Sequence, residues 1–170
     1  ARPTTGAITG KVSNALTQAS SNQGLYLSGN PAAFQISTFS ICCWFKTSNS
    51  GASLNIASKL NAWALGVDSG TLKAYDWVLG GWQSTSQTVN DGNWHHLAYT
   101  RQNGTNGAKV YLDGTLRLTY TATIQDQNSN FYIGNLSGFS VALPGQIDEF
   151  AIWNAVIGTD IIALHRNSGN

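Results

Sequence analysis

Alternation of apolar and mixed side chains is the feature that most constrains the fold of this chain. In residues 39–46, FSICCWFK, the odd positions carry only apolar side chains and the even positions are mixed. Successive side chains of a β-strand point to opposite faces of its sheet. We therefore predict a strand with one face against a core and a mixed outer face, in a sheet that is covered on one side.

Similar short segments recur along the chain, and clusters of Gly, Asn and Ser separate them. Dipeptides such as Gly80-Gly81 and Asp113-Gly114 are typical of tight reversals between antiparallel strands. Residues 90–93 and 101–107 are predicted to be a turn and a loop. The remaining predicted strands are residues 24–29, 54–60, 63–69, two within 70–89, 94–101, two within 108–120, 130–136 and 144–154.

One segment has helical character, residues 158–167 (GTDIIALHRN), with Thr159 as the expected N-cap and Asp160 in the first turn. No internal repeat, linker or low-complexity segment interrupts the pattern. The sequence predicts a single all-β domain over residues 1–170, built as two packed antiparallel sheets with one short C-terminal helix.

Composition narrows the range of partners. Charged residues make up 10% of the 170 residues and the formal net charge is +1, so no basic field exists to hold nucleic acid. No apolar run approaches the ~20 residues of a membrane-spanning helix, so membrane insertion is not expected. The neutral polar surface suits a secreted protein or a virion surface. Sequons at Asn103 and Asn135 permit glycosylation, or occur by chance in an Asn-rich chain.

Cys42 and Cys43 are adjacent, and neighbours in a strand point to opposite faces. The two thiols are therefore expected to be reduced and not bonded to each other. One can act as a small core residue, and an intermolecular disulfide is the alternative.

The ordered set of motifs GLYLSG, FSICCWFK, DGNWHHLAYTR, VYLDG, FYIGN and GQIDEFAIWNAVIGTDIIAL resembles the laminin-G-like domains of the concanavalin A-like lectin and glucanase superfamily. The similarity runs from about Gly24 to Leu164 and is greatest to the bacterial and phage branch, which is also similar to pentraxins. The resemblance implies a jelly-roll β-sandwich that binds carbohydrate or protein ligands in adhesion, often with calcium. Cys42-Cys43 stand where the family usually has a small residue, and AVIGTDII is a weaker form of its helical signature.

Some relatives in that superfamily are glycoside hydrolases, but a glycosidase needs two carboxyl groups with opposed roles. Glu149 is the only glutamate in this chain, and its neighbour Asp148 should point to the opposite face of the strand. No catalytic serine elbow or phosphate-binding glycine loop occurs either. We therefore expect a protein that is not an enzyme.

His95 and His96 attract attention as metal ligands. Because they alternate on one strand, they cannot chelate a single ion together, and only His165 remains as a third histidine. In the family that the chain resembles, this segment is a framework strand. We interpret both histidines as structural.

Asp148 shares its parity with Phe150 and Ile152, which suggests a buried face, and a buried carboxylate requires compensation. Backbone N–H groups are one source. A Ca²⁺ ion is the other, because in similar sandwiches an Asp in the last long strand holds a structural calcium with carbonyls from early loops. Residues 28–30 could supply such a carbonyl here.

Trp77 and Trp82 flank the expected Gly80-Gly81 reversal, and Trp44 lies on the outer face of its strand. Exposed indole rings offer flat apolar surfaces for sugar rings. These three residues are the predicted ligand-binding residues, with Tyr75 and Gln83 as weaker companions. The alternative is that the tryptophans fill the ends of the sandwich.

Two functions remain after this reasoning. The first is a non-catalytic extracellular or virion-borne module that binds a glycan or glycoprotein surface, with a structural Ca²⁺. The second is a structural or decoration subunit of a capsid, tail or filament, which assembles with itself or with a host lattice protein.

Overall fold

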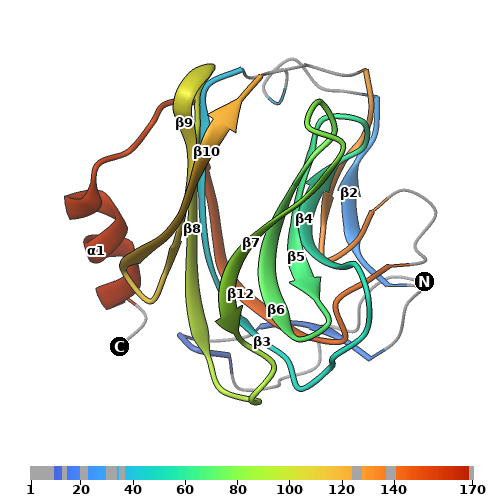
Figure 1. Ribbon diagram of the computed structural model, residues 1–170. Helices are drawn as coiled ribbons and strands as arrows, with labels where there is room; N and C mark the ends of the chain where they lie inside the picture. The colour runs from blue at the N-terminus through green and yellow to red at the C-terminus, as the bar shows by residue number, and fades with distance from the viewer. Residues whose placement is uncertain are drawn as a thin grey trace.

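The computed structural model describes residues 10–12, 15–19, 23–29, 34, 37–123, 128–136 and 141–168. In this part of the chain, two six-stranded sheets pack face to face, and a single helix lies on the outer side of one of them (Figure 1). All neighbouring strands within the sheets are antiparallel. This confirms the predicted two-sheet sandwich with a short C-terminal helix.

The first sheet has the strand order β1-β12-β3-β8-β9-β10, and its strands are β1 (Leu16–Gln18), β12 (Gly145–Trp153), β3 (Phe39–Lys46), β8 (His95–Arg101), β9 (Gly104–Leu112) and β10 (Thr115–Ala122). The second sheet has the order β2-β11-β4-β5-β6-β7, with β2 (Leu25–Leu27), β11 (Phe131–Ile133), β4 (Leu54–Lys59), β5 (Trp63–Asp68), β6 (Thr71–Asp76) and β7 (Gly81–Thr88). The helix α1 spans Thr159–Ser168.

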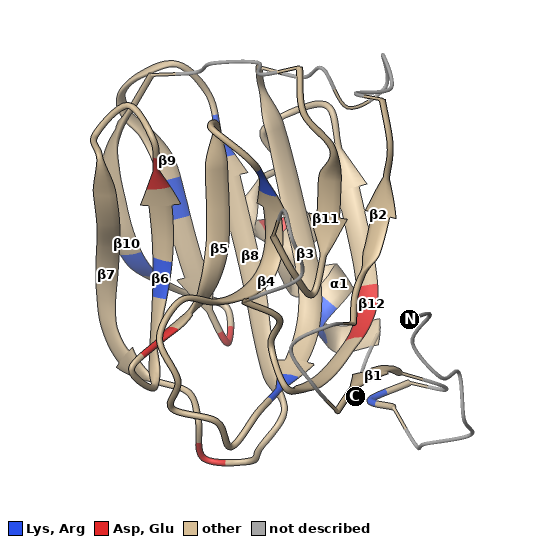
Figure 2. Ribbon diagram, turned by 90° about the vertical axis from the view of Figure 1, so that its right-hand side faces the viewer, with Lys and Arg blue, Asp and Glu red and all other residues tan. Residues whose placement is uncertain are grey.

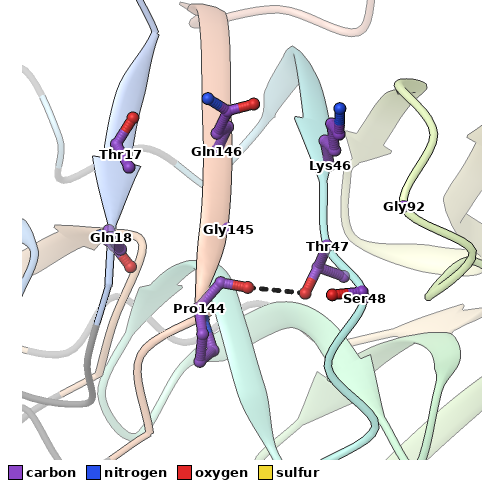
Figure 3. Close-up of a pocket in the computed structure, with 9 residues that line it drawn as sticks. All are labelled: Thr17, Gln18, Lys46, Thr47, Ser48, Gly92, Pro144, Gly145 and Gln146. Carbon is purple, nitrogen blue, oxygen red and sulfur yellow. Dashed lines mark hydrogen bonds between the residues drawn. The ribbon is translucent and has the colours of Figure 1, made fainter. Parts of the chain in front are cut away.

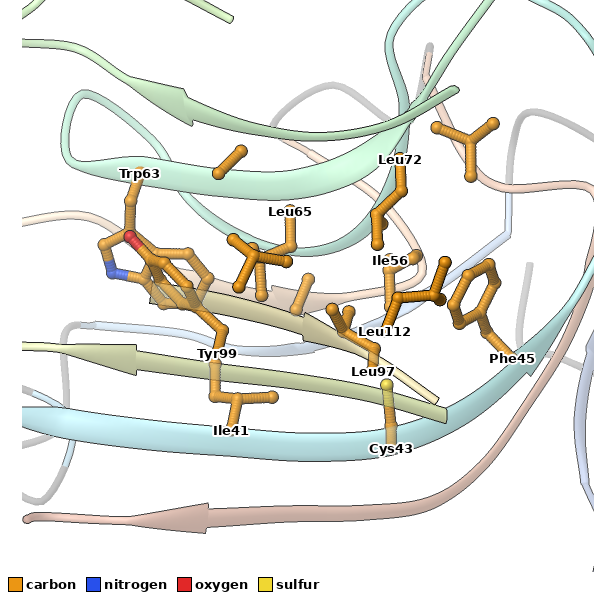
Figure 4. Packing of buried hydrophobic residues seen from close by; sticks show 14 of the residues in the cluster. Ile41, Cys43, Phe45, Ile56, Trp63, Leu65, Leu72, Leu97, Tyr99 and Leu112 are labelled. Carbon is orange, nitrogen blue, oxygen red and sulfur yellow. The ribbon is translucent and has the colours of Figure 1, made fainter. Parts of the chain in front are cut away.

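The core lies between the sheets and follows the predicted alternation. Figure 4 shows side chains of β3 and β8, such as Ile41, Cys43 and Tyr99, facing those of β4, β5 and β6. Ile41 and Cys43 have no exposed surface, and neither does Leu65 on the facing sheet. Burial of this apolar surface is the main driving force that holds the layers together.

A buried ion pair also joins the two sheets. Arg101 of β8 donates to Oδ2 of Asp76 in β6 at 2.9 Å, and the two side chains are 1% and 0% exposed. Arg101 also donates to the Tyr99 hydroxyl at 3.0 Å, which lies 2.8 Å from the Tyr120 hydroxyl. Removing one partner would leave an uncompensated buried charge, so this network fixes how the end of β6 lies against the first sheet.

The outer face of the first sheet differs from the prediction, because α1 covers it. Cys42, Ala98, Tyr111 and Ile162 form a second buried cluster on this face. The even positions Ser40, Cys42 and Trp44 of β3 are therefore buried as well, and the expectation of a sheet covered on one side only is wrong for this strand. Figure 1 shows α1 beside β8 and β9, on the side away from the second sheet.

Strand and turn boundaries agree with the sequence in most places. The hairpin at Asp113-Gly114 is confirmed, and both residues have positive φ (52° and 82°), as a two-residue turn of this kind requires. Residues 101–107 are not one long loop, since β9 already begins at Gly104. Gly158 supplies the first helical acceptor, to the Ile162 N–H, so Thr159 is the first residue of α1 and not its cap.

Candidate functional site

Three aromatic rings gather on the outer face of the second sheet, at the β6–β7 turn. Tyr75 of β6 is paired with Trp82 of β7, and their ring centroids are 5.2 Å apart. Trp77 follows β6 directly, and its ring lies 4.4 Å from that of Tyr75. Both contacts are edge-to-face, so Tyr75 stands between the two indoles and holds their orientation.

The turn that carries these rings is fixed from inside the sandwich. Oδ1 of Asp76 accepts hydrogen bonds from the N–H groups of Val78 and Leu79, at 2.9 and 3.1 Å. Gly80 has φ 72°, which favours glycine, and its N–H donates to the Asp76 carbonyl. Asp76 thus links the ion pair with Arg101 to the position of Trp77. The reversal occupies residues 77–80, slightly earlier than the predicted Gly80-Gly81.

A cleft of about 240 Å³ opens beside the rings. Its described lining residues include no ionised side chain; the ion pair of Lys73 with Asp68, at 2.7 Å, is not part of the lining. The lining residues are Ser53, Asn55, Ala64, Tyr75, Trp77, Trp82, Leu136 and Val141. We call this the aromatic cleft.

Asn55 gives the aromatic cleft a polar group with unused capacity. Its side chain is 1% exposed, and its Nδ2 donates to the carbonyls of Ser53 (2.7 Å) and Val141 (3.3 Å). Its Oδ1 has no hydrogen-bond partner among the described residues. A buried acceptor without a partner costs about 1–3 kcal/mol. Sequence reasoning missed Asn55, and no local signal distinguishes it from the other asparagines.

The backbone around Asn55 is shaped by a bulge. The β4–β5 register shifts between Asn55 and Ala57, and Gly66 lies opposite Asn55. A Cβ on Gly66 would stand 2.3 Å from the Leu54 carbonyl oxygen, so only glycine permits this close approach.

Trp44, the third predicted ligand-binding residue, is on the outer face of the first sheet as expected but is only 5% exposed. Lys11 Nζ lies 4.7 Å from its ring centroid, and the His96 ring packs edge-on at 5.3 Å. The ring therefore has no open face for a ligand. The predicted exposure is wrong, because the segment around Lys11 and the helix side of the sheet cover this position.

Asp148 does not share a face with Ile152, contrary to the parity argument. A β-bulge in β12 shifts the register between Asp148 and Ala151, with Glu149 at φ 50°. Asp148 therefore pairs with Trp44 on the outer face, whereas Ile152 pairs with Ile41 on the core face. One extra residue in a strand reverses the parity of everything that follows it.

The carboxylate of Asp148 is 8% exposed and is compensated by backbone N–H groups. Oδ2 accepts from Val12 at 3.0 Å and Oδ1 from Glu149 at 2.9 Å. Of the proposed carbonyl donors, Ser28 and Gly29 follow β2 in the other sheet, and Asn30 lies outside the described residues. Each carboxylate oxygen still has a further lone pair, so calcium at this residue stays a prediction.

His95 and His96 point to opposite sides, as the alternation predicts. His95 lies between Asp113 (2.9 Å) and Asp91 (3.2 Å), and its hydrogen bond with Asp113 raises its pKa. His96 is fully buried under α1, where burial lowers its pKa to about 4. Nε2 of His96 lies 3.0 Å from Nδ1 of His165, a proximity that the sequence did not reveal.

A second, polar cleft of about 370 Å³ lies at the end of β1, β12 and β3 (Figure 3). Thr47 donates from its hydroxyl to the Pro144 carbonyl at 2.7 Å, and Lys46 is the only charged side chain among the described lining residues. Among the described residues, neither this cleft nor the aromatic cleft has Asp or Glu in its lining. Figure 2 shows charged residues thinly spread over the described sheets.

Two further sequence predictions can be compared with the structure. Cys42 and Cys43 are free thiols on opposite faces of β3, and both are fully buried. Asn135 has no exposed surface, and its amide donates to the Gln23 carbonyl, so this sequon is not accessible to glycosylation, whereas Asn103 is exposed. No helix in the described part of the chain is long and apolar enough to cross a membrane.

A family model described as the concanavalin A-like lectin/glucanases superfamily matches residues 19–163. No curated protein matches the sequence. Among solved structures, domain 4 of AbnA, an extracellular GH43 arabinanase from Geobacillus stearothermophilus, was determined in complex with arabinotriose. It has a TM-score of 0.73 at 19% identity, over 94% of this chain and 80% of that one.

The sialidase CBM40 of Ruminococcus gnavus, determined with α2,3-sialyllactose, has a TM-score of 0.67 at 16% identity, over 89% of this chain and 96% of that one. The binding domain of Paraclostridial Mosquitocidal Protein 1 has a TM-score of 0.71 at 16% identity, over 96% of this chain. The chain spans only 45% of that binding domain. At these identities, the likeness concerns the fold.

Proposed function

Since the chain belongs to the concanavalin A-like lectin/glucanases superfamily, we propose that it is a non-catalytic carbohydrate-binding module of a secreted protein or a virion surface. Fold alone does not fix function, so the proposal depends on the aromatic cleft. The observation that carries it is the combination of two indole rings, oriented by Tyr75, with the unpartnered Oδ1 of Asn55.

Each part of the aromatic cleft suits a sugar. The C–H face of a pyranose or furanose ring can stack on an indole, while a ring hydroxyl donates to a buried acceptor. None of the described residues that line the cleft is charged, which favours a neutral sugar over an acidic one. The ligands of two structural neighbours, arabinotriose and α2,3-sialyllactose, support glycan as the class of ligand.

A glycan array that contains neutral and acidic oligosaccharides tests the proposal, with the wild type and the Trp77→Ala and Trp82→Ala variants. We expect saturable binding of neutral glycans that both substitutions weaken. Tyr26→Ala is the matched control, because Tyr26 is a 52% exposed aromatic residue on the same sheet but outside the cleft. Wild-type binding by Trp82→Ala, or no binding by the wild type, would contradict the proposal.

A structural Ca²⁺ at Asp148 remains part of this proposal, since carboxylate oxygens with free lone pairs can take calcium. The test is the melting temperature in chelator and after calcium is added back, for the wild type and Asp148→Ala. An increase with calcium in the wild type that is absent from Asp148→Ala supports the ion. An unchanged wild-type melting temperature would remove calcium from the account.

The second candidate function, assembly through protein contacts, is favoured by one observation. β2 is the last strand of its sheet among the described residues, and Leu25, Tyr26 and Leu27 are 47%, 52% and 41% exposed. Exposed apolar edge strands are sites of pairing between chains. Size-exclusion chromatography with light scattering distinguishes the two functions: concentration-dependent oligomers that Leu25→Lys abolishes, without glycan binding, would favour assembly.

A further inference from the structure

One thiol and two imidazoles converge on the covered face of the first sheet, away from the aromatic cleft. Cys42 of β3, His96 of β8 and His165 of α1 each place one ligand atom within 4.8 Å of the other two. Cys42 and His96 have no exposed surface, and His165 is half-buried. We call these three residues the Cys–His cluster.

Strand pairing and helix docking bring these distant residues together. β3 and β8 pair so that Cys42 is opposite Ala98 and Trp44 is opposite His96, which places Cys42 and His96 diagonally on the same face. Ile162 is buried in the same cluster as Cys42 and fixes α1 over them, so that His165 in the last turn reaches His96.

The hydrogen bonds determine which ring nitrogens carry lone pairs. Nε2 of His165 lies 2.9 Å from the Glu149 carbonyl, which can only accept, so this nitrogen carries the proton and Nδ1 has the lone pair. His96 then donates from Nε2 to that Nδ1 at 3.0 Å. Nδ1 of His96 is consequently unprotonated, and it has no hydrogen-bond partner among the described residues.

Burial keeps the cluster neutral. It lowers the pKa of His96 to about 4 and also lowers the pKa of His165. At neutral pH each ring is therefore uncharged and carries a single proton. Burial also raises the pKa of the Cys42 thiol to about 12, so the sulfur keeps its proton unless a cation displaces it. Neutral imidazoles are the form of histidine that binds metals.

We propose that Cys42, His96 and His165 form a binding site for a thiophilic transition-metal ion of the Zn²⁺ class, which fastens α1 to the first sheet. One thiolate and two imidazoles are ligands that Zn²⁺ prefers, whereas Ca²⁺ requires oxygen. Tetrahedral Zn²⁺ needs nitrogen ligands about 3.3 Å apart and nitrogen and sulfur about 3.6 Å apart, so ligand atoms that lie within 4.8 Å of one another must approach by up to about 1 Å to reach that geometry.

Binding exchanges protons in a defined way. Cys42 releases its thiol proton to solvent and binds as thiolate, while the His96 proton moves from Nε2 to Nδ1, so that Nε2 faces the ion. His165 keeps its Nε2 proton on the Glu149 carbonyl, the outer-shell hydrogen bond that metal-binding histidines commonly make. Water completes the four ligands on the half-buried His165 side.

The experiment is titration of the metal-free protein with Zn²⁺ by calorimetry and with Co²⁺ by absorption spectroscopy. We expect one ion per chain, a thiolate-to-cobalt charge-transfer band, and slower hydrogen exchange in α1 when Zn²⁺ is bound. The chain offers matched controls one residue away from two ligands. Cys43→Ala and His95→Gln should bind as the wild type does, whereas Cys42→Ala and His96→Gln should lose the band and at least about tenfold in affinity.

His165→Ala provides an independent variant, because its half-buried place in the last turn of α1 lets it fold if a core substitution does not. It should also lose the affinity. Absence of saturable binding at one ion per chain, or a cobalt spectrum without the thiolate band, would overturn the proposal. So would wild-type affinity in Cys42→Ala, or loss of binding in His95→Gln, which would place the ion at the exposed Asp91–His95–Asp113 group.

Discussion

The outer faces of the two sheets differ, because one is covered and the other is partly open. The first sheet carries α1, and its outward side chains, including Trp44 and His96, are buried. The second sheet leaves Tyr75, Trp77 and Trp82 partly exposed around a cleft. An outward-pointing tryptophan therefore has no fixed role in this fold: Lys11 and His96 cover Trp44, whereas Trp77 and Trp82 stay partly exposed beside the cleft.

The largest expected effect is a difference in the free energy of unfolding that the protein loses when a tryptophan is removed from one face or from the other. Trp44→Ala removes a buried ring and should lower the free energy of unfolding by about 3–5 kcal/mol. Trp82→Ala removes a partly exposed ring and should lower it by less than about 1 kcal/mol. Urea unfolding measures both free energies. Equal losses would contradict the statement that Trp44 is buried and Trp82 is partly exposed.

The second effect is a pH dependence that only the covered face should show. In the presence of chelator, the folded-state pKa of His96 is about 4, below its unfolded value of about 6.5. A depressed histidine pKa stabilises the protein above the unfolded value, and this contribution is lost as the pH falls from about 6.5 to 4. The loss is on the order of 3 kcal/mol.

His95 on the opposite side of the strand should act in the other direction. Its pKa is raised by Asp113, so its contribution is complete below about 6.5 and disappears as the pH rises through the folded-state pKa. Unfolding curves of His96→Gln and His95→Gln across this range separate the two. A wild-type acid slope in His96→Gln would contradict the assignment.

How far the sequence predicts this molecule depends on distance along the chain. Alternation correctly placed Cys42 and Cys43 on opposite faces, and the Asp113-Gly114 dipeptide correctly predicted a hairpin, because both are properties of neighbouring residues. β1 was not predicted, since a three-residue strand has too few positions to show a period. The bulge at Glu149 was also missed, although it reverses the parity of β12, so that Ile147 and Ile152 both face the core.

The candidate site was predicted only in part, for the same reason. Trp77 and Trp82 are brought together by a local hairpin, and the sequence was sufficient to single them out. Asn55, which completes the aromatic cleft, comes from β4 across the sheet. Cys42, His96 and His165 meet only after α1 docks on the sheet, and no spacing rule connects positions so far apart.

The third effect is on binding at the open face. Trp82→Ala should weaken binding of a neutral glycan by about 1–2 kcal/mol, or roughly 5- to 30-fold, because one stacking surface is lost. Isothermal titration measures this with Trp44→Phe as the comparison, since that variant keeps an aromatic ring at a buried position. A greater loss of affinity in Trp44→Phe than in Trp82→Ala would reverse the roles of the faces.

The smallest expected effect is that of removing Lys11, which lies over the Trp44 ring. Lys11→Ala removes a cation 4.7 Å from the ring centroid and should cost roughly 0.5–1 kcal/mol of stability. Glycan affinity should not change. If Lys11→Ala increased glycan affinity, Trp44 would be a ligand surface that Lys11 obstructs, and the comparison between the faces would fail.

The most direct test of the difference between the faces is an NMR titration with a glycan that the protein binds. It follows the indole N–H signals of the six tryptophans as the glycan is added. The account predicts that the signals of Trp77 and Trp82 shift with saturation while that of Trp44 stays in place. Shifts at Trp44 without shifts at Trp77 and Trp82 would contradict it.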